Sequence, residues 1–144
     1  MKKAFVVVLT VAAGIAGAFA ATTFTWTGGG TPNEDGSLNW TDSANWGVAE
    51  PAYPGRTSTD DKVVFSAGTA ARVRLDITKT INLMTAKADN LDLTFDSPDG
   101  HVLTLRSSFE LGANASTGQS HSTITLDGAK IVAAQSTYLQ SGSS

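Results

Sequence analysis

Apolar and polar residues alternate in a series of short runs between Lys62 and Leu126. The apolar positions are Val63, Phe65, Val73, Leu75, Ile81, Leu83, Leu91, Leu93, Phe95, Leu103, Leu105, Phe109, Leu111, Ile124 and Leu126. Successive side chains of a strand point to opposite faces, so each run presents one apolar row to a core and one polar row to water. The gaps between the runs are too short for a helix of the usual length. The pattern therefore predicts an all-β chain of many short strands.

Two arrangements of these strands fit the alternation. In a parallel β-helix, successive coils stack and their inward rows form one continuous core. In a β-sandwich, the strands pair as hairpins, and the Ser-Pro-Asp-Gly run at 97–100 is good turn chemistry between arms at 91–96 and 101–106. The next best turn signal is Asp127-Gly128, and the other gaps carry none as clear. The residues alone leave both arrangements open.

The first twenty residues have the pattern of a secretory signal peptide. Lys2 and Lys3 precede an apolar stretch at 4–19, and Ala18-Phe19-Ala20 is an A-x-A cleavage pattern. An uncleaved membrane anchor is the alternative, but the stretch is shorter than the ~20 residues that a bilayer requires. We expect cleavage after Ala20 and an exported chain without a membrane span.

Composition narrows the classes of function. Removal of residues 1–20 takes away two lysines, so 8 Lys and Arg (10 minus 2) face 13 Asp and Glu, a net charge of −5. This acidic balance, with scattered arginines, argues against nucleic-acid binding. The chain has no cysteine. Disulfides and cysteine-based metal sites are thereby excluded, and stability must come from burial and hydrogen bonding.

All the tryptophans, Trp26, Trp40 and Trp46, lie in a loop-rich segment at 21–58. One interpretation is a structural cap, because the open end of a stacked sheet exposes apolar surface and unpaired edges. The other is a carbohydrate-binding platform, because flat aromatic faces stack on sugar rings. We therefore divide the chain into a signal peptide at 1–20, a Trp-rich cap at 21–58, a ladder of strands at 59–134 and a polar tail at 135–144.

The segment after the signal peptide resembles a known family. Its motifs are Thr-Trp-Thr-Gly-Gly-Gly at 25–30, Asn-Trp-Thr-Asp-Ser-Ala-Asn-Trp at 39–46, Pro-Gly at 54–55 and Asp-Asp-Lys-Val-Val-Phe at 60–65. These are similar to the mature N-terminus of bacterial autotransporter-type surface proteins with β-strand repeats. The resemblance covers most of 24–127 and implies a right-handed parallel β-helix whose first coils lie at 59–134. Such passengers are usually far longer, and the uncapped tail at 135–144 is expected to be an interrupted array.

The sequence offers little that predicts chemistry. By alternation, Asp76, Asp92, Asp96 and Arg106 face outward, and paired carboxylates could cleave polysaccharides or hold Ca²⁺. A solvated charged face is the simpler interpretation. Oxygen side chains of Asn33, Asp35 and Asn39 surround Gly36, but their spacing matches no complete Ca²⁺ loop. His101 and His121 stand alone in the sequence. We predict no catalytic residues, metal site or cofactor.

We expect a non-enzymatic, exported bacterial surface or extracellular protein of the structural or adhesin type, built as a β-helical stalk. Its partners would be glycans or other cell-surface components. A secreted carbohydrate-binding module with a sandwich fold, using the three tryptophans, is the alternative. A fragment of a β-helical polysaccharide-degrading enzyme is a third hypothesis.

Overall fold

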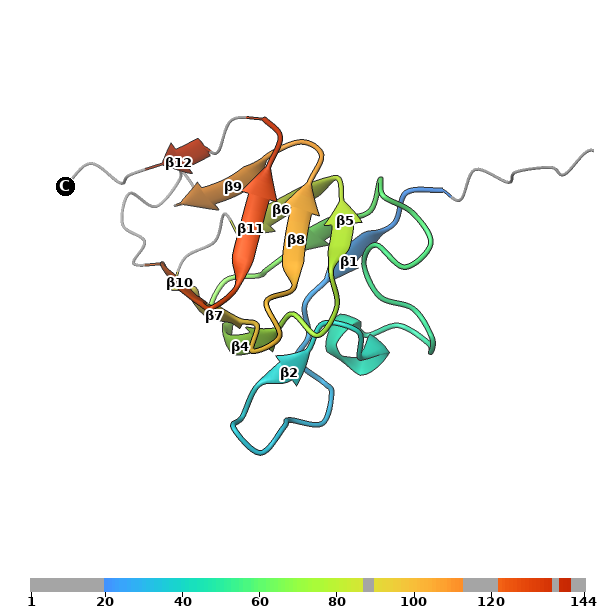
Figure 1. The fold of residues 1–144 in the computed structure, drawn as a ribbon, viewed down its shortest axis with the longest axis vertical. Coiled ribbons are helices and arrows are strands. Elements are labelled where there is room, and N and C mark those ends of the chain that lie inside the picture. Colours follow the sequence, from blue (N-terminus) through green and yellow to red (C-terminus); the bar gives the residue numbers. More distant parts are fainter. Residues whose placement is uncertain (1–19, 87–89, 113–121, 136–137, 141–144) are drawn as a thin grey trace, which may run out of the picture.

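The computed structural model describes residues 20–86, 90–112, 122–135 and 138–140, and it is all-β (Figure 1). Within these ranges the regular elements are β-strands and one short 3₁₀ helix, η1 (Ser43–Trp46). The expected all-β class is thus confirmed. Most of the predicted signal peptide, His121 and much of the polar tail lie outside the described residues. Where the structure is described, no helix is long and apolar enough to cross a membrane.

The strands form three sheets, and every paired strand runs parallel to its neighbour. The five-stranded sheet contains, in spatial order, β1 (Thr23–Thr25), β3 (Lys62–Val64), β6 (Leu83–Ala86), β9 (Phe109–Gly112) and β12 (Tyr138–Gln140). The four-stranded sheet contains β2 (Leu38–Asn39), β4 (Ala70–Arg74), β7 (Asp92–Asp96) and β10 (Thr123–Asp127). The three-stranded sheet contains β5 (Lys79–Ile81), β8 (Val102–Leu105) and β11 (Lys130–Ala133).

From β3 onward, the chain visits the three sheets in a fixed order. It passes from the five-stranded sheet (β3) to the four-stranded sheet (β4) and the three-stranded sheet (β5), and it repeats this circuit through β6–β8 and β9–β11. Each strand therefore pairs with the strand three places later in the sequence. Figure 1 shows β5, β8 and β11 side by side along one face.

Register aligns the inward apolar residues of successive circuits in columns. In the five-stranded sheet Phe24, Val63, Met84 and Phe109 are register partners, and all four are buried. In the other two sheets the columns are Val73–Phe95–Leu126 and Ile81–Leu105–Ala133. The three sheets thus enclose one apolar core, as the alternation predicts.

Burial falls toward the last circuit of the described chain. Val73 and Phe95 are fully buried at 0%, whereas Leu126 in the same column is 50% exposed. Ile124, which pairs with the fully buried Leu93, is half-buried. The alternation correctly placed Ile124 and Leu126 in register with inward residues of β7. It could not predict their exposure, because alternation does not show whether further residues cover a strand.

The hairpin arrangement required by a sandwich is not found among the described strands. The segments on either side of the Ser-Pro-Asp-Gly turn, β7 and β8, belong to different sheets. The turn has the chemistry expected of it, because Gly100 has φ +72° and donates its N–H to the carbonyl of Ser97 at 3.1 Å. It bends the chain from one sheet to the next instead of folding it back on itself. The isolated bridge between Asp96 and Gly128 is antiparallel.

Candidate functional site: the tryptophan cluster and a charged hollow

The three tryptophans lie in the core at the N-terminal end of the sheets. Trp26, Trp40 and Trp46 are 5%, 0% and 3% exposed. Trp46 meets Trp26 and Trp40 edge to face, each at a centroid distance of 4.9 Å. Stacking on a sugar ring needs an open indole face, so this placement favours the structural cap. The predicted carbohydrate-binding role of the three residues stays a prediction, and it would require the rings to become exposed.

The indole N–H groups of Trp40 and Trp46 both donate to backbone carbonyls of this segment. Trp40 Nε1 donates to the carbonyl of Pro54 at 3.0 Å, and Trp46 Nε1 donates to the carbonyl of Trp40 at 2.8 Å. A buried indole N–H without an acceptor would cost about 1–3 kcal/mol. The loop carrying Pro54 is thereby attached to the segment carrying Trp40, which is what a cap made of loops requires.

Asn45 and Asp61, both buried, hold the loops of this region in place. Asn45 Oδ1 accepts from the Gly30 N–H at 2.8 Å, and its Nδ2 donates to the Asn39 carbonyl at 2.9 Å. Asp61 accepts from the backbone N–H groups of Thr22 at 3.0 Å and Gly55 at 2.9 Å. These side chains pair backbone groups of the loops, which indicates a structural role for both residues.

A second cluster of polar residues lies on the outer face of the four-stranded sheet. Arg74, Asp96 and Asp127 are register partners on β4, β7 and β10. Arg74 donates to Asp96 Oδ2 from Nε at 3.1 Å and from Nη2 at 2.8 Å. Arg72 donates to Asp127 Oδ2 at 2.8 Å and lies 3.6 Å from Asp96 Oδ2.

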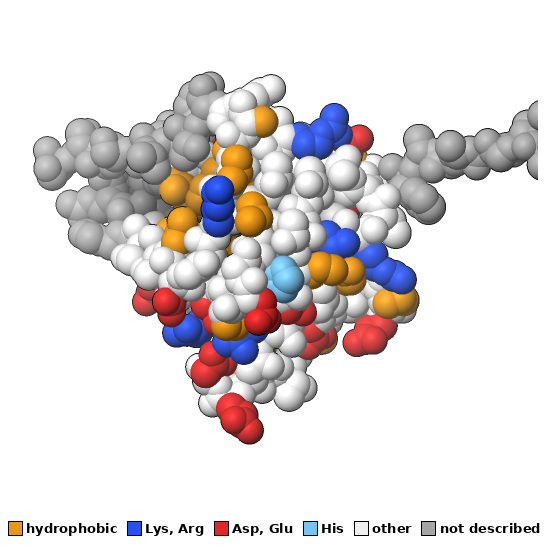
Figure 2. All heavy atoms as spheres, viewed as in Figure 1, with side chains coloured by type: hydrophobic (Ala, Val, Ile, Leu, Met, Phe, Trp, Pro, Cys, Tyr) orange, Lys and Arg blue, Asp and Glu red, His pale blue; other side chains and the backbone are white. Residues whose placement is uncertain are grey.

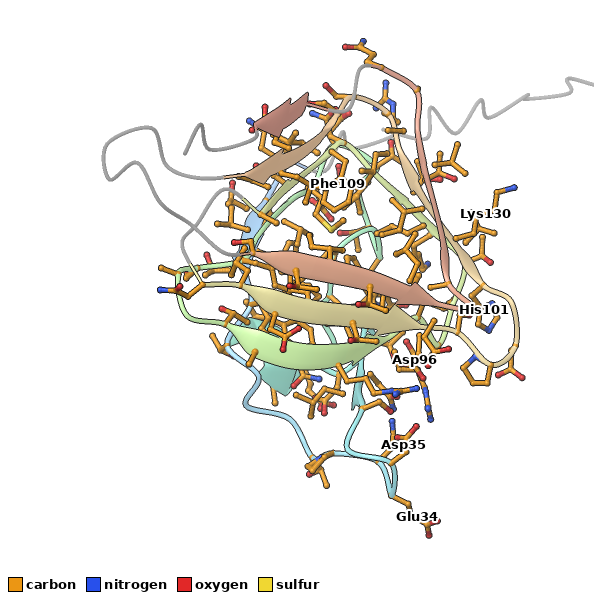
Figure 3. The ribbon with its side chains drawn as sticks, turned by 90° about the vertical axis from the view of Figure 1, so that its left-hand side faces the viewer. Glu34, Asp35, Asp96, His101, Phe109 and Lys130 are labelled. Atoms are coloured by element: carbon orange, nitrogen blue, oxygen red, sulfur yellow. The ribbon has the colours of Figure 1, made fainter. Side chains whose placement is uncertain are left out.

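Asp35, from the loop before β2, completes this cluster by accepting from Arg74. Charges therefore alternate in sign along Asp35, Arg74, Asp96, Arg72 and Asp127. Figure 2 shows acidic and basic side chains gathered at this end of the molecule, and Figure 3 shows Asp35 and Asp96 on the same side. The set connects the neighbouring strands β4, β7 and β10 with the loop before β2.

Hydrogen bonds set the protonation of two members. The hydroxyl and the backbone N–H of Ser37 donate to Asp35 at 2.6 and 3.1 Å, and they lower the pKa of Asp35 from 3.8 to about 2, with Arg74 adding to the effect. The hydrogen bond to Asp96 raises the pKa of Arg74 above its ordinary value. Both groups are therefore charged at neutral pH.

The cluster lines a hollow of about 400 Å³. Its lining comprises Asp35, Arg72, Arg74, Asp96, Ser97, Pro98, Asp127 and Gly128. The Asp96 side chain is 4% exposed, while those of Asp127, Asp35 and Arg72 are 59%, 43% and 39% exposed. Asp96 thus forms the floor of the hollow, and the other three form its rim.

The outward residues singled out in the sequence do not form a catalytic constellation. Asp96 is in the hollow, but Asp76 accepts from Thr41, Arg106 donates to Asp60, and Asp92 is exposed beside Ala70. Asp96 also differs from the solvated residue that alternation predicts, because Arg74 covers it. Sequence reasoning missed Arg72 and Asp127 as its neighbours.

The side chains of Asn33 and Asn39, near Gly36, are hydrogen-bonded to each other, whereas Asp35 accepts from Ser37 and Arg74. Asn33 Nδ2 donates to Asn39 Oδ1 at 2.8 Å and to Ser37 Oγ at 3.0 Å. His101 Nδ1 lies 3.4 Å from the hydroxyl of Thr78. No group of three His, Cys, Asp or Glu that could hold a metal occurs in the part of the chain that the structure describes.

Comparison of the chain with protein-family models, with curated proteins and with solved structures gives no match.

Proposed function

We propose that the chain is an exported, non-enzymatic structural protein of the bacterial surface or extracellular space, in which the three sheets are the faces of a right-handed parallel β-helix. The observation that carries the proposal is the repeated circuit, in which each strand pairs in parallel with the strand three places later. The crossover connection between two parallel strands of one sheet is right-handed with few exceptions. A stack of this kind is a rigid rod whose outward rows present a surface.

The buried tryptophan cluster supports a cap at the N-terminal end of this rod. Trp26 donates its backbone N–H to Val64 at 2.9 Å, and Trp40 donates to Arg74 at 2.9 Å, so the segment continues both sheets. The cluster then covers Phe65 with ring contacts at 5.7 and 6.4 Å. Deletion of residues 22–47 should uncover this end and cause aggregation of the 21–144 chain in analytical ultracentrifugation. A folded, monomeric deletion variant would contradict the cap.

Paired cysteines test the β-helical pairing, because the native chain has none to interfere. Thr94 and Thr125 are register partners on neighbouring strands. Strand spacing of about 4.8 Å is within the range that a disulfide spans. We expect the double variant Thr94→Cys, Thr125→Cys to form a disulfide on mild oxidation. The control pair, Thr94→Cys with Thr104→Cys, should stay reduced; a disulfide there would instead favour the hairpin of a sandwich.

Export is tested separately by expressing the full chain in a bacterial host and sequencing the N-terminus of the product outside the cytoplasm. Cleavage after Ala20 predicts a product that begins at Ala21. A chain that keeps Met1 and stays with the membrane fraction would contradict the exported, anchor-free form.

A further inference from the structure

Two polar atoms at the floor of the charged hollow have no hydrogen-bond partner among the described residues. They are Arg72 Nε and Asp96 Oδ1, and both are buried. One is a donor and the other an acceptor, and they belong to side chains that approach each other to 3.6 Å through Arg72 Nη2 and Asp96 Oδ2. Unpaired buried polar atoms are rare in folded proteins, and each costs about 1–3 kcal/mol. A group that both accepts and donates would satisfy the pair.

The charges around the hollow indicate a neutral group. The two guanidinium groups would repel a metal cation, and the three carboxylates would repel an anion. A hydroxyl is neutral and can accept one hydrogen bond while donating another. The hollow's volume of about 400 Å³ lies within the range of small-molecule sites, which is about 300–1,000 Å³.

We propose that this hollow binds a neutral saccharide, one hydroxyl of which accepts from Arg72 Nε–H and donates to Asp96 Oδ1. Further hydroxyls would donate to the carboxylates of Asp35 and Asp127 on the rim. The proposal deepens the proposed function, since it rests on a rod that presents its outer rows to other molecules. It places the saccharide on the outer face of the four-stranded sheet and leaves the tryptophans in the cap.

The two side chains differ in exposure and in the number of hydrogen bonds that hold them. Asp96 is 4% exposed and is fixed by the two hydrogen bonds from Arg74. Arg72 is 39% exposed, and its direct bond is to Asp127, which is 59% exposed. Pairs with that exposure contribute at most about 1 kcal/mol. A rotation of Arg72 away from Asp127 would therefore cost little, and the proposal requires such a rotation for a hydroxyl to reach the two buried atoms.

The test uses the folded 21–144 chain and a printed array of neutral and acidic oligosaccharides. We expect retention on at least one neutral saccharide, which is then titrated into chain labelled with ¹⁵N-arginine. The Nε–H resonance of Arg72 should shift on titration, and that of Arg106 should not. Arg106 is the matched control because it pairs with Asp60, another exposed carboxylate, away from the hollow.

Substitutions separate the Nε–H donor from the positive charge. Arg72→Gln should weaken binding of the retained saccharide by about ten-fold or more, the expected effect of losing a hydrogen bond between charged and neutral groups. Arg72→Lys keeps the charge but has no Nε–H, so it should weaken binding similarly. Arg106→Gln should leave the affinity unchanged. Thermal unfolding of each variant should confirm that the fold is intact.

Three results would overturn the saccharide site. They are retention of no neutral saccharide, retention that Arg72→Gln leaves unchanged, and a crystal structure in which an ordered water alone bridges Arg72 Nε and Asp96 Oδ1 in the presence of millimolar saccharide. Each of these is compatible with correct cysteine pairing between Thr94 and Thr125. Failure of that pairing would reject the β-helical rod and, with it, the hollow, so the experiments distinguish failure of the site alone from failure of the rod.

Discussion

Arg74 and Asp96 are register partners on β4 and β7, and the guanidinium of Arg74 donates two hydrogen bonds to a single carboxylate oxygen of Asp96. The Asp96 side chain is 4% exposed and that of Arg74 is 22% exposed, so the pair is shielded from water on the outer face of the sheet. The interaction compensates a buried charge and fixes the register of two successive circuits. It also leaves the second carboxylate oxygen of Asp96 unpaired in the hollow.

Arg74→Met should destabilise the chain strongly because it leaves the carboxylate of Asp96 buried without its main partner. Breaking a buried ion pair by removal of one partner costs about 3–5 kcal/mol, and we expect about 3 because Arg74 is partly exposed. Urea unfolding of the 21–144 chain measures the change in the free energy of unfolding.

Arg106→Met is the control for this substitution. Arg106 and Asp60 are 52% and 58% exposed, so loss of their ion pair should cost less than about 1 kcal/mol. Equal destabilisation by the two substitutions would show that the Arg74–Asp96 pair has no special role. The double variant Arg74→Met, Asp96→Leu should recover part of the loss, since no charge then remains buried.

Asp35 makes stability depend on pH in the acidic range. Its pKa is about 2 in the folded chain against 3.8 as the ordinary value, because Ser37 donates two hydrogen bonds to the carboxylate. Because the pKa of Asp35 is lower in the folded chain than in the unfolded chain, its ionised carboxylate stabilises the fold fully above pH 3.8. This contribution is lost as the pH falls from 3.8 through 2. Asp35→Asn should therefore be destabilising at pH 6, and its difference from the native chain should shrink toward pH 2.

Glu34→Gln is the control, because it removes one charge from the same loop while its side chain points away from Asp96 (Figure 3). Chemical unfolding of the three chains at a series of pH values gives the comparison. A difference between Asp35→Asn and the native chain that stays constant from pH 6 to pH 2 would contradict the role assigned to Ser37.

Alternation along the chain was sufficient to predict the strand-rich class and most of the core. Val63, Val73, Leu93 and Leu105 are all inward and fully buried, at 0% exposure. Period-two patterning specifies which face a side chain occupies, and burial of that face follows from the hydrophobic effect. The cap region was harder, since η1 is only four residues long and depends on Asp42 Oδ1 accepting from the Ala44 N–H at 3.0 Å.

Prediction of the charged cluster also required the register between strands, which alternation along the chain does not provide. Val73-Arg74, Phe95-Asp96 and Leu126-Asp127 each consist of an inward apolar residue followed by an outward charge. That repeated pair was the available signal for the charged cluster. The loops between the circuits differ in length, so nothing in the sequence states that these three pairs align. Asp35 joins them from a distant loop through side-chain contacts that only the folded chain provides.

Gly55 allows the loop at 54–55 to approach β5 closely. A Cβ at Gly55 would lie 2.8 Å from the backbone carbonyl oxygen of Thr80, whereas one at Gly68 would meet nothing within 4 Å. The two glycines have nearly equal φ values, +77° and +75°, so alanine is strained similarly at both. We expect Gly68→Ala to cost about 1–2 kcal/mol from the backbone alone. Gly55→Ala should cost about 1–3 kcal/mol more, because the carbonyl must move.

Thermal and urea unfolding of the two alanine variants measure this difference directly, and each variant serves as the other's control. Similar destabilisation would mean that the loop can withdraw from β5 without loss, and Gly55 would then have only a conformational role.

Trp46 is the centre of the aromatic cluster, and its removal distinguishes a cap from a surface platform. Its ring contacts Trp26 and Trp40 at 4.9 Å, Phe24 at 6.2 Å and Phe65 at 6.4 Å. Trp46→Ala should therefore lower the free energy of unfolding by about 3–5 kcal/mol, as expected for a large buried aromatic residue. Trp46→Phe keeps ring packing but loses the N–H donated to Trp40, so it should cost less.

The fluorescence of the native chain provides the matching observation. Because the three indoles are at most 5% exposed, their emission should be blue-shifted and poorly quenched by acrylamide, and saccharides that bind the hollow should leave it nearly unchanged. A platform predicts the opposite on each count: strong quenching, protection by a saccharide, and loss of saccharide binding in Trp46→Ala at little cost in stability. That combination would contradict the structural cap and would assign saccharide binding to the tryptophans instead of the hollow.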